Sequence, residues 1–384
     1  MNHVPRILVL FGNVPLFGQE RANIEALDAL QQTGCEVLFL IRGEWTKDSI
    51  QPELNRRNLR FLVVPYFDAV RYGVSFRVWW NNLKGILGGS WQLLRQIRVF
   101  RATHIHVGST ANVLNFLPAL MLTRLPLVFR AGDVPSQHHL LWRWVWIFAR
   151  WRTGHFVCDS NFIRDRLVGM GAKQDICSVL YAPAPRRTHA GAAAVLPFKP
   201  ANILSVIYIG QISQAKGVHL LVEAALHLCQ KRDDIRFVIA GDYEWNNPLG
   251  RSLVEQVSQS GLQDRIVFTG FVENIDGLYG QADVHVCPSL CDEAYGLTVV
   301  EAKGRGVPSI IFNSGGLPEL VSDGVDGTVC KDKSSAAIMN AIVAYADDRS
   351  LLQSQGEAAR QSLHRLQIDG FARRWRKIYE NAAP

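Results

Sequence analysis

Residues 287–312 read CPSLCDEAYGLTVVEAKGRGVPSIIF, and this stretch decides the fold. The apolar run Ala282–Pro288 predicts a buried strand, and Val307–Phe312 predicts a second one. Between them, Ser289–Gly296 has the composition of a loop and Leu297–Gly304 begins a helix. Two buried strands joined by one helix form a β-loop-α-β unit, which predicts a parallel sheet with helices on its faces.

Two glutamates, Glu293 and Glu301, lie where such a unit binds ligands. The first is in the loop at the carboxyl end of the strand, and the second is on the helix behind it. Ligands of open α/β sheets bind in the crevice at that end. There Gly296 lets a ligand approach the backbone, and free N–H groups at the helix start suit a phosphate. The pair favours a ligand with hydroxyls and phosphates, such as a nucleotide sugar. On spacing alone, two solvated surface glutamates remain the alternative.

A second candidate phosphate element lies earlier in the chain. The predicted strand Ile203–Ile209 runs into Gly210, and the loop after it ends at Lys216 and Gly217, where a helix begins. The ammonium group of Lys216 would add to the helix dipole in holding a phosphate. A surface lysine that happens to precede a helix is the alternative. Later in the chain, FNSGGLPELVSDGVDG predicts a flexible Gly315-Gly316 turn before a helix that begins at Leu317.

Strand-like runs alternate with helical patterns along the whole chain, which favours an α/β fold with parallel sheets. The predicted strands of the first half are Arg6–Phe11, Glu36–Ile41, Leu59–Val64, His104–Val107, Leu127–Phe129 and His155–Cys158. Those of the second half are Ile203–Ile209, Ile235–Ala240, Ile266–Thr269, Val284–Pro288, Ser309–Phe312 and Gly327–Val329. The stretch Tyr181–Ala201, rich in Pro, Ala and Arg, separates the two series as a linker. We predict two Rossmann-like doubly wound domains facing each other across a cleft, over residues 1–190 and 200–366.

The composition excludes several classes of protein. The chain has 384 residues, of which 48% are hydrophobic and 20% charged, so a packed core is expected and wholesale disorder is not. Its start predicts a buried strand rather than a signal peptide, and charges interrupt every candidate membrane span. Seven cysteines form no CxxC pattern, which favours reduced thiols. We expect a cytoplasmic protein, at most peripheral on the inner face of the cytoplasmic membrane.

The net charge of +7 is concentrated in one region. Between Ala69 and Cys158 the chain has eleven Lys and Arg, and its only acidic residue there is Asp133. Seven of the ten tryptophans fall in the same region: Trp79, Trp80, Trp91, Trp142, Trp144, Trp146 and Trp151. Such a mixture across residues 71–152 suits an anionic membrane surface. The alternative is that the tryptophans pack in the core while the arginines are solvated. No nucleic-acid recognition module accompanies the region, so no nucleic-acid partner is expected.

In chain order, the segments VIYIGQISQAKGVHLLVEA, VIAGD, VFTGFV, EAYGLTVVEA and SGGLPELVSDGVDG strongly resemble the nucleotide-sugar-binding half of the family 4 glycosyltransferases, which are retaining enzymes of the GT-B fold. The resemblance covers Ile203–Val329. It implies that Glu293 contacts hydroxyls of the donor sugar and that Glu301 holds the ribose of the nucleotide. It further implies that Lys216 meets the diphosphate.

The same resemblance implies the rest of the donor site. The backbone at Gly296, Leu297 and Thr298 would meet the distal phosphate. Val272, with Phe271, would line the base site through backbone contacts. Gly210 belongs to the donor loop, and Gln211 stands where family members often carry an arginine. This departure removes one positive charge from the expected diphosphate site.

The first half resembles the family more loosely. LFGNVPLFGQERANIEAL is similar to the family's glycine loop, with Gly18 at the close approach to donor and acceptor. Many members carry a histidine in the acceptor-side loop, where this chain has Gly132, followed by Asp133. His138 or His139 is the candidate substitute. The last helix, within residues 367–384, resembles the one that crosses back onto the first domain.

These observations predict a metal-independent retaining glycosyltransferase that moves a sugar from a nucleotide diphosphate donor to a glycan or lipid-linked acceptor, in envelope polysaccharide or glycolipid synthesis. No cofactor is expected beyond the donor substrate. The chain contains no Asp-x-Asp that would chelate a metal-bound diphosphate, and no GxGxxG that would indicate a dinucleotide oxidoreductase. A nucleotide-sugar epimerase and an inactive nucleotide-sugar-binding scaffold are the alternatives.

Overall fold

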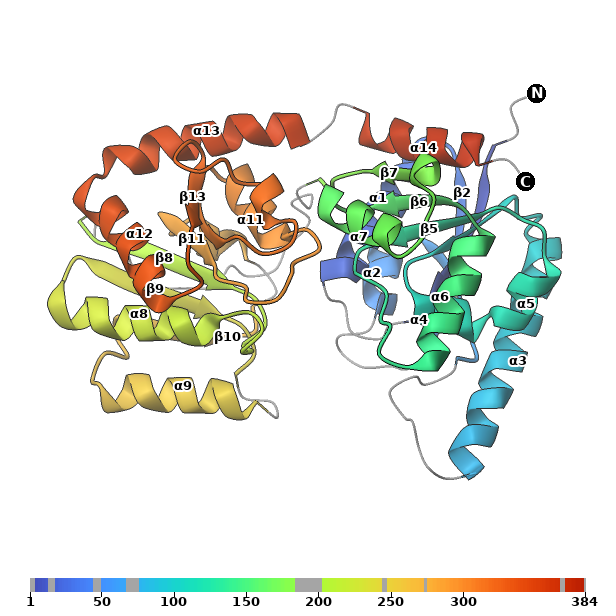
Figure 1. The fold of residues 1–384 in the computed structure, drawn as a ribbon, viewed down its shortest axis with the longest axis horizontal. Helices are drawn as coiled ribbons and strands as arrows, with labels where there is room; N and C mark the ends of the chain where they lie inside the picture. The colour runs from blue at the N-terminus through green and yellow to red at the C-terminus, as the bar shows by residue number, and fades with distance from the viewer. Residues whose placement is uncertain are drawn as a thin grey trace. The chain divides into compact units, whose positions relative to one another are not determined.

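The computed structural model describes residues 4–12, 18–43, 50–66, 76–183, 202–243, 247–272, 275–366 and 370–382. The chain divides into two compact units (Figure 1). Unit 1 comprises Met1–Ala182 and Asp369–Pro384, and unit 2 comprises Pro183–Ile368. Each unit contains its own parallel sheet and its own core. The cleft expected between them stays a prediction.

The described part of unit 1 contains a sheet with the strand order β3-β2-β1-β4-β5-β6-β7. Every neighbouring pair is parallel. The strands are β1 (Arg6–Phe11), β2 (Glu36–Arg42), β3 (Arg60–Val64), β4 (His104–Val107), β5 (Leu127–Ala131), β6 (Thr153–Cys158) and β7 (Cys177–Val179). Six of them were predicted from apolar runs. The edge strand β7 has three half-buried residues and no apolar run to mark it.

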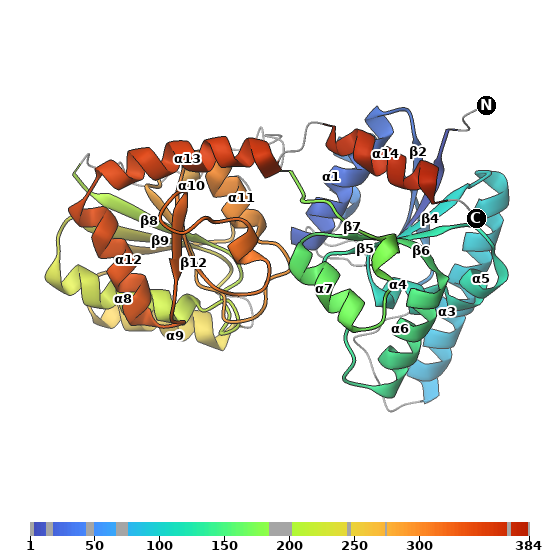
Figure 2. The same cartoon turned by 45° about the horizontal axis from the view of Figure 1, so that its top comes forward.

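Helices cover both faces of this sheet (Figures 1 and 2). One face packs against α1 (Gly18–Gln32), α2 (Ile50–Arg56) and α14 (Phe371–Asn381), which share a buried cluster with β1 and β2. A second layer contains α3 (Phe76–Val99), α4 (Thr110–Asn115), α5 (Leu117–Leu122) and α6 (Leu140–Arg152), which contact one another in series. The helix α7 (Asn161–Gly169) precedes the 3-10 turn Gln174–Ile176.

The C-terminal helix α14 belongs to unit 1 (Figure 2). It packs against α1 and buries Trp375. The hydroxyl of Tyr379 lies 2.6 Å from Nδ1 of His106 on β4, and Nε2 of His104 lies 3.3 Å from the carbonyl of Ala382. Apolar burial and these polar contacts together attach the end of the chain to the first sheet.

The described part of unit 2 contains a sheet with the strand order β10-β9-β8-β11-β12-β13, again parallel throughout. The strands are β8 (Leu204–Ile209), β9 (Ile235–Ala240), β10 (Ile266–Gly270), β11 (Val284–Cys287), β12 (Ser309–Phe312) and β13 (Gly327–Cys330). All six were predicted, with ends that differ by two residues at most. Alternate residues of β8 face opposite sides, because Val206 and Tyr208 belong to one buried cluster and Ile207 to another.

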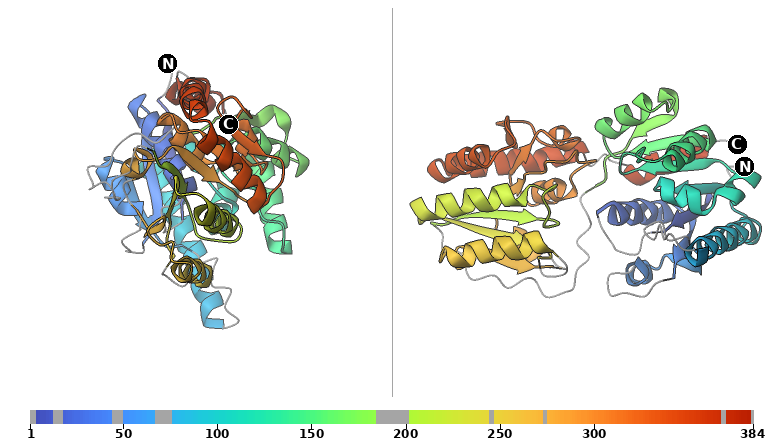
Figure 3. Two further views of the ribbon diagram at one scale, coloured as in Figure 1. Left: turned by 90° about the vertical axis from the view of Figure 1, so that its left-hand side faces the viewer. Right: turned by 60° about the horizontal axis from the view of Figure 1, so that its bottom comes forward.

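Three helices pack on one face of this second sheet: α8 (Val218–Lys231), α9 (Pro248–Gln259) and α12 (Ser335–Asp347). The right-hand view of Figure 3 shows α8 and α9 side by side. The opposite face packs against α10 (Asp276–Tyr279) and α11 (Leu297–Gly304), and α13 (Ser350–Leu366) contacts α11. A helix was predicted to begin at Leu317. The structure has a single 3-10 turn there, Leu317–Glu319, with a proline at its second position.

Candidate functional site

The predicted donor residues lie at the point in unit 2 where the strand order reverses. The chain moves outward from β8 to β9 and β10, then returns to place β11 beside β8. Loops that leave the carboxyl ends of two such strands diverge and open a crevice. Lys216 lies in the loop after β8, and Glu293 lies in the loop after β11. The topology therefore brings together two side chains that are 77 residues apart.

Lys216 and Glu293 form an ion pair in this crevice. Nζ of Lys216 donates to Oε1 of Glu293 at 2.6 Å, and their side chains are 30% and 16% exposed. The hydroxyl of Ser289 donates to the same carboxylate oxygen. Burial acts to lower the pKa of Lys216, but the charge of Glu293 and its hydrogen bond outweigh burial and raise that pKa. Lys216 is therefore a cation at neutral pH, and Glu293 is not a solvated loop residue.

The two loops are fastened to each other through backbone contacts. The N–H of Leu290 donates to the carbonyl of Ala215 at 2.9 Å. A Cβ at Gly217 would overlap the carbonyl oxygen of Pro288, so a larger residue there would push the loops apart. The N–H groups at the start of α8, which have no acceptor within the helix, therefore lie beside the loop that carries Glu293.

A third segment supports Glu293 from behind. The N–H of Gly316 donates to the carbonyl of Glu293 at 2.7 Å, and the hydroxyl of Ser314 donates to the carbonyl of Ser289 at 2.5 Å. Gly315 has φ +59°, and a Cβ there would overlap the carbonyl oxygen of Glu293. Only glycine satisfies both the left-handed conformation and this close approach. The predicted Gly315-Gly316 turn is thus a backbone support for the loop.

The helix α11 provides a second N-terminus in the same crevice. Gly296 caps it with φ +109°, and Leu297 and Thr298 form its first turn. A Cβ at Gly296 would come within 2.5 Å of Cδ2 of Leu317. The first N–H groups of a helix have no intrahelical acceptor and carry partial positive charge. Together with the start of α8 and Lys216, they make this part of unit 2 electropositive.

Glu301 lies one turn further along α11 and is half-buried. The buried hydroxyl of Tyr279 donates to the carbonyl of Thr298 at 2.9 Å and lies 3.4 Å from Oε2 of Glu301. Burial, followed by the charge of Glu301, raises the pKa of Tyr279 well above its usual value, so this hydroxyl keeps its proton. Nη1 of Arg305 donates to the carbonyl of Glu301 at 2.9 Å. The Glu301 carboxylate therefore lies beside a buried hydroxyl, and Arg305 holds the Glu301 backbone.

The remaining predicted donor residues follow the strands β8 and β10. Gly210 follows β8 directly, and the carbonyl of Gln211 accepts a 2.6 Å hydrogen bond from the hydroxyl of Tyr208, while the Gln211 side chain is exposed. Phe271 and Val272 follow β10 at the edge of the sheet. The Phe271 ring is 62% exposed, and Val272 packs against a buried cluster. An exposed aromatic ring at a strand end is available for stacking.

The acceptor-side residues belong to unit 1. Gly18 begins α1, while Asp133 and His138 are exposed in the segment after β5. Oδ1 of Asp133 accepts a 2.7 Å hydrogen bond from the N–H of Val134. Gly132 is tightly packed, because a Cβ there would lie 2.9 Å from Cγ of Gln19. Whether these residues approach the crevice in unit 2 stays a prediction.

Sequence reasoning did not identify several residues that shape these sites. Ser289 and Tyr279 position the two glutamates, yet a serine after a strand and a tyrosine in a short helix carry no distinctive signal. In unit 1, Arg130 and Asp159 form a buried ion pair at 2.8 Å where β5 and β6 end. Burial raises the pKa of Asp159 to about 6 although Arg130 acts against it. The only sign of this ion pair in the sequence is that each of the two charged residues directly follows a predicted strand.

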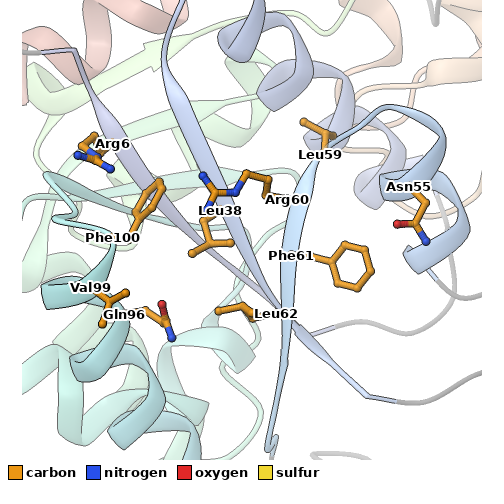
Figure 4. A pocket seen from close by; sticks show the side chains of 10 residues that line it. All are labelled: Arg6, Leu38, Asn55, Leu59, Arg60, Phe61, Leu62, Gln96, Val99 and Phe100. Carbon is orange, nitrogen blue, oxygen red and sulfur yellow. The ribbon is translucent and has the colours of Figure 1, made fainter.

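A cavity of about 570 Å³ lies elsewhere, between the starts of β1 and β3 and the end of α3 (Figure 4). It is at the amino ends of the strands of unit 1, so it is not the predicted donor site. The guanidinium groups of Arg6 and Arg60 lie 5.1 Å and 5.9 Å from the ring centre of Phe100 at its wall. Within the described residues, no group of three or more His, Cys, Asp or Glu side chains could hold a metal ion. None of the described helices is long and apolar enough to cross a membrane.

Comparisons with known proteins identify the class. Two doubly wound parallel-sheet units are the architecture of GT-B glycosyltransferases. The family model "Glycosyltransferase Family 4" matches residues 18–183, and the model "Glycosyl transferases group 1" matches residues 198–362. The chain belongs to the group 1 glycosyltransferases of family 4.

This chain matches its curated relatives over only part of their length. Alpha-D-kanosaminyltransferase of Streptomyces kanamyceticus is 31% identical over 40% of this chain and 39% of its own length. The lipopolysaccharide core biosynthesis mannosyltransferase LpsB of Rhizobium meliloti is 33% identical over 45% of this chain and 50% of its own length. The match thus spans half or less of these relatives.

Solved structures share the whole fold. HepE of Anabaena, in complex with UDP and glucose, superposes with a TM-score of 0.75 at 19% identity, covering 94% of this chain and 95% of HepE. A glycosyltransferase of Rickettsia africae gives a TM-score of 0.79 at 19% identity, covering 99% of this chain and 98% of the other. At this identity the likeness establishes the GT-B fold, and the predicted fold class is confirmed.

Proposed function

We propose that this chain is a retaining glycosyltransferase that moves a sugar from a nucleotide diphosphate donor to a glycan or lipid-linked acceptor. The observation that carries the proposal is the Lys216–Glu293 pair, held at 2.6 Å in a crevice beside the first turns of α8 and α11. A diphosphate needs several positive groups, and a sugar needs a carboxylate to accept hydrogen bonds from its hydroxyls. This crevice has both.

In the proposed complex the diphosphate takes the place of Glu293 as the partner of Lys216. The N–H groups at Gly296–Thr298 receive the distal phosphate, and the released Glu293 accepts hydrogen bonds from the sugar. Glu301, oriented by Tyr279, holds the ribose. Phe271, Val272, Gly210 and Gln211 line the nucleotide, and Gly18 approaches the donor from unit 1. HepE, which shares the fold, was crystallised with UDP and glucose, and this supports a nucleotide sugar as donor.

The proposed reaction breaks the bond between the anomeric carbon and the diphosphate oxygen. Lys216 and the two helix N-termini stabilise the negative charge that develops on the leaving group. An acceptor hydroxyl forms the new bond on the same face of the sugar and passes its proton to a diphosphate oxygen. Neither glutamate acts as a nucleophile in this scheme. Asp133 and His138 are the candidate residues for orienting the acceptor.

We propose that the reaction requires no cofactor or metal ion, because Lys216 and the helix N-termini already supply positive charge for the leaving group. We also propose that the chain acts in the cytoplasm, as a peripheral protein on the inner face of the cytoplasmic membrane, in envelope polysaccharide or glycolipid synthesis. The name of LpsB, a lipopolysaccharide core mannosyltransferase, supports this setting.

The test is a screen of nucleotide sugars for thermal stabilisation, followed by a transfer assay with the donor that binds. A donor that binds only the folded state raises Tm. Glu293→Gln and Lys216→Ala should each lower turnover while the thermal unfolding of the free protein stays cooperative. Near wild-type transfer by both variants would overturn the site. Donor isomerisation without acceptor would indicate an epimerase, and binding without any turnover would indicate a scaffold.

A further inference from the structure

The long helix α3 turns an apolar stripe toward solvent. Phe76, Trp80, Leu87 and Trp91 are all exposed, and Phe76 is the most exposed of them at 77%. At 100° per residue these four positions fall within an arc of about 60°. Such a stripe normally faces the core of a soluble protein. Here the core-facing side of α3 is a different one, where Leu93 is fully buried.

A second helix of the same layer repeats the pattern. On α6, Leu140, Trp144, Ile147 and Trp151 follow one another at intervals of four, three and four residues, and all four are exposed. The opposite side of α6 is buried through Val145, Trp146 and Ala149. The helix is therefore apolar on both sides, and only one side is used by the fold. Both helices contact α4, which places them in one layer of unit 1 (Figure 2).

Every charged side chain on these two helices is basic. Nζ of Lys84 lies 5.7 Å from the ring centre of Trp80, and the guanidinium of Arg95 lies 5.7 Å from that of Trp91. Arg98 on α3 and Arg143 on α6 are also exposed. No Asp or Glu occurs between residues 76 and 132, nor within α6. We call the exposed stripes of α3 and α6, with these basic residues, the α3–α6 surface.

We propose that the α3–α6 surface docks on an anionic lipid membrane. Tryptophans beside arginine and lysine on an amphipathic helix are typical of segments that lie in the membrane interface. A second copy of this chain is a poor occupant, because a two-fold interface would place these like charges against each other. The proposal extends the peripheral location proposed above and names the surface that provides it.

The test is vesicle flotation with phosphatidylcholine vesicles that contain either no phosphatidylglycerol or 30% of it. The wild-type chain should float with the anionic vesicles and stay unbound with the neutral ones, and added salt should weaken binding. The variant K84Q/R95Q/R98Q loses three charges, each contributing about a fivefold factor to partitioning, so binding should fall by about 100-fold. The variant W80A/W91A/W144A/W151A should also lose binding and should lose the quenching of tryptophan fluorescence by brominated lipid.

A matched control removes the same charge from unit 2. Lys231, Arg251 and Lys331 are exposed and lie outside the α3–α6 surface, so K231Q/R251Q/K331Q should bind anionic vesicles nearly as wild type does. An equal loss of binding in this control would overturn the proposal, as would wild-type protein that does not float with anionic vesicles. Self-association that the tryptophan variant abolishes, without vesicle binding, would assign the surface to a second copy instead.

Donor binding, measured by thermal shift on the same samples, separates this inference from the proposed function. Donor binding without vesicle binding would refute the membrane-docking proposal and leave the transferase proposal in place. Vesicle binding without donor binding would refute the transferase proposal and leave the membrane-docking proposal in place.

Discussion

The ion pair between Lys216 and Glu293 makes a prediction that separates nucleotide binding from sugar transfer. In the ligand-free protein, Lys216 already has a partner at 2.6 Å, so a diphosphate must break that pair before it gains the ammonium. The pair is partly exposed, at 30% and 16% of its side chains, and breaking it costs about 1–2 kcal/mol. Glu293→Gln removes this cost. The variant should therefore bind the free nucleoside diphosphate about 5- to 30-fold more tightly than the wild type.

The same substitution should have the opposite effect on transfer. A hydrogen bond from a sugar hydroxyl to a charged carboxylate contributes about 1.5–3 kcal/mol, so turnover with the nucleotide sugar should fall by about 10- to 150-fold. Lys216→Met should weaken nucleoside diphosphate binding, since it removes the cation and leaves Glu293 facing the phosphates. In the double variant, where that repulsion is absent, loss of the ammonium alone should cost about 1.5–3 kcal/mol relative to Glu293→Gln.

The assay is isothermal titration with the nucleoside diphosphate that stabilises the chain most, together with steady-state transfer kinetics. Glu255→Gln is the matched control, because Glu255 is exposed on α9 and carries the same charge. Glu255→Gln should change neither the affinity for the nucleoside diphosphate nor the turnover number by more than about twofold. Weaker nucleoside diphosphate binding by Glu293→Gln would refute the reasoning, since it would mean that Glu293 helps to bind the diphosphate rather than competing with it for Lys216.

Three further predictions concern stability. Gly315→Ala adds both left-handed strain and overlap with a backbone carbonyl, so it should lower the free energy of unfolding by about 3 kcal/mol. Gly324 has φ +71° and open space around it, so Gly324→Ala should lower the free energy of unfolding by only about 1 kcal/mol. Chemical denaturation of both variants measures the difference. Trp375→Ala should cost about 3–5 kcal/mol in unit 1, because its ring is buried between α14 and the sheet, and an unchanged urea midpoint would contradict the docking of α14. Burial, helped at His106 by the charge of Arg130, lowers the pKa values of His106 and His285 to about 3. Stability from each histidine is therefore present above pH 6.5 and is lost as pH falls toward 3. Unit 2 should therefore lose about 2 kcal/mol between pH 7 and pH 5, whereas in unit 1 the raised pKa of Asp159 offsets part of the loss from His106. A flat stability profile of unit 2 over that range would contradict the burial of His285.

Much of the fold could be predicted because most strands of both sheets are buried on both faces. Strands of that kind are continuous apolar runs, and twelve strands were found from the sequence with ends close to those observed. The edge strand β7 has only three half-buried residues, so it left no such run. The segment at Leu317 resembled a helix start, yet it forms only the 3-10 turn Leu317–Glu319, and the Gly315-Gly316 turn before it supports the loop of Glu293.

The donor site was partly predictable for a related reason. In a parallel sheet, loops at the carboxyl ends of strands lie together, so Lys216 and Glu293 could be assigned to one crevice from their positions after strands. Their direct ion pair could not be inferred, because it depends on the strand order that makes β8 and β11 neighbours. The supporting hydrogen bonds from Ser289 and Tyr279 depend on the same long-range packing.

The sequence by itself determined the fold class, the family resemblance and the accumulation of tryptophan and basic residues in one region. It could not determine which tryptophans are buried. Because α6 is apolar around most of its circumference, the spacing of its apolar residues does not show which side of the helix faces the core. The tertiary structure decided it: Trp146 packs against Phe129 and Phe156 in the core, while Trp144 and Trp151 remain in solvent. Local sequence fixes which side of a helix is apolar, but only the packing of neighbouring elements fixes which apolar side is covered.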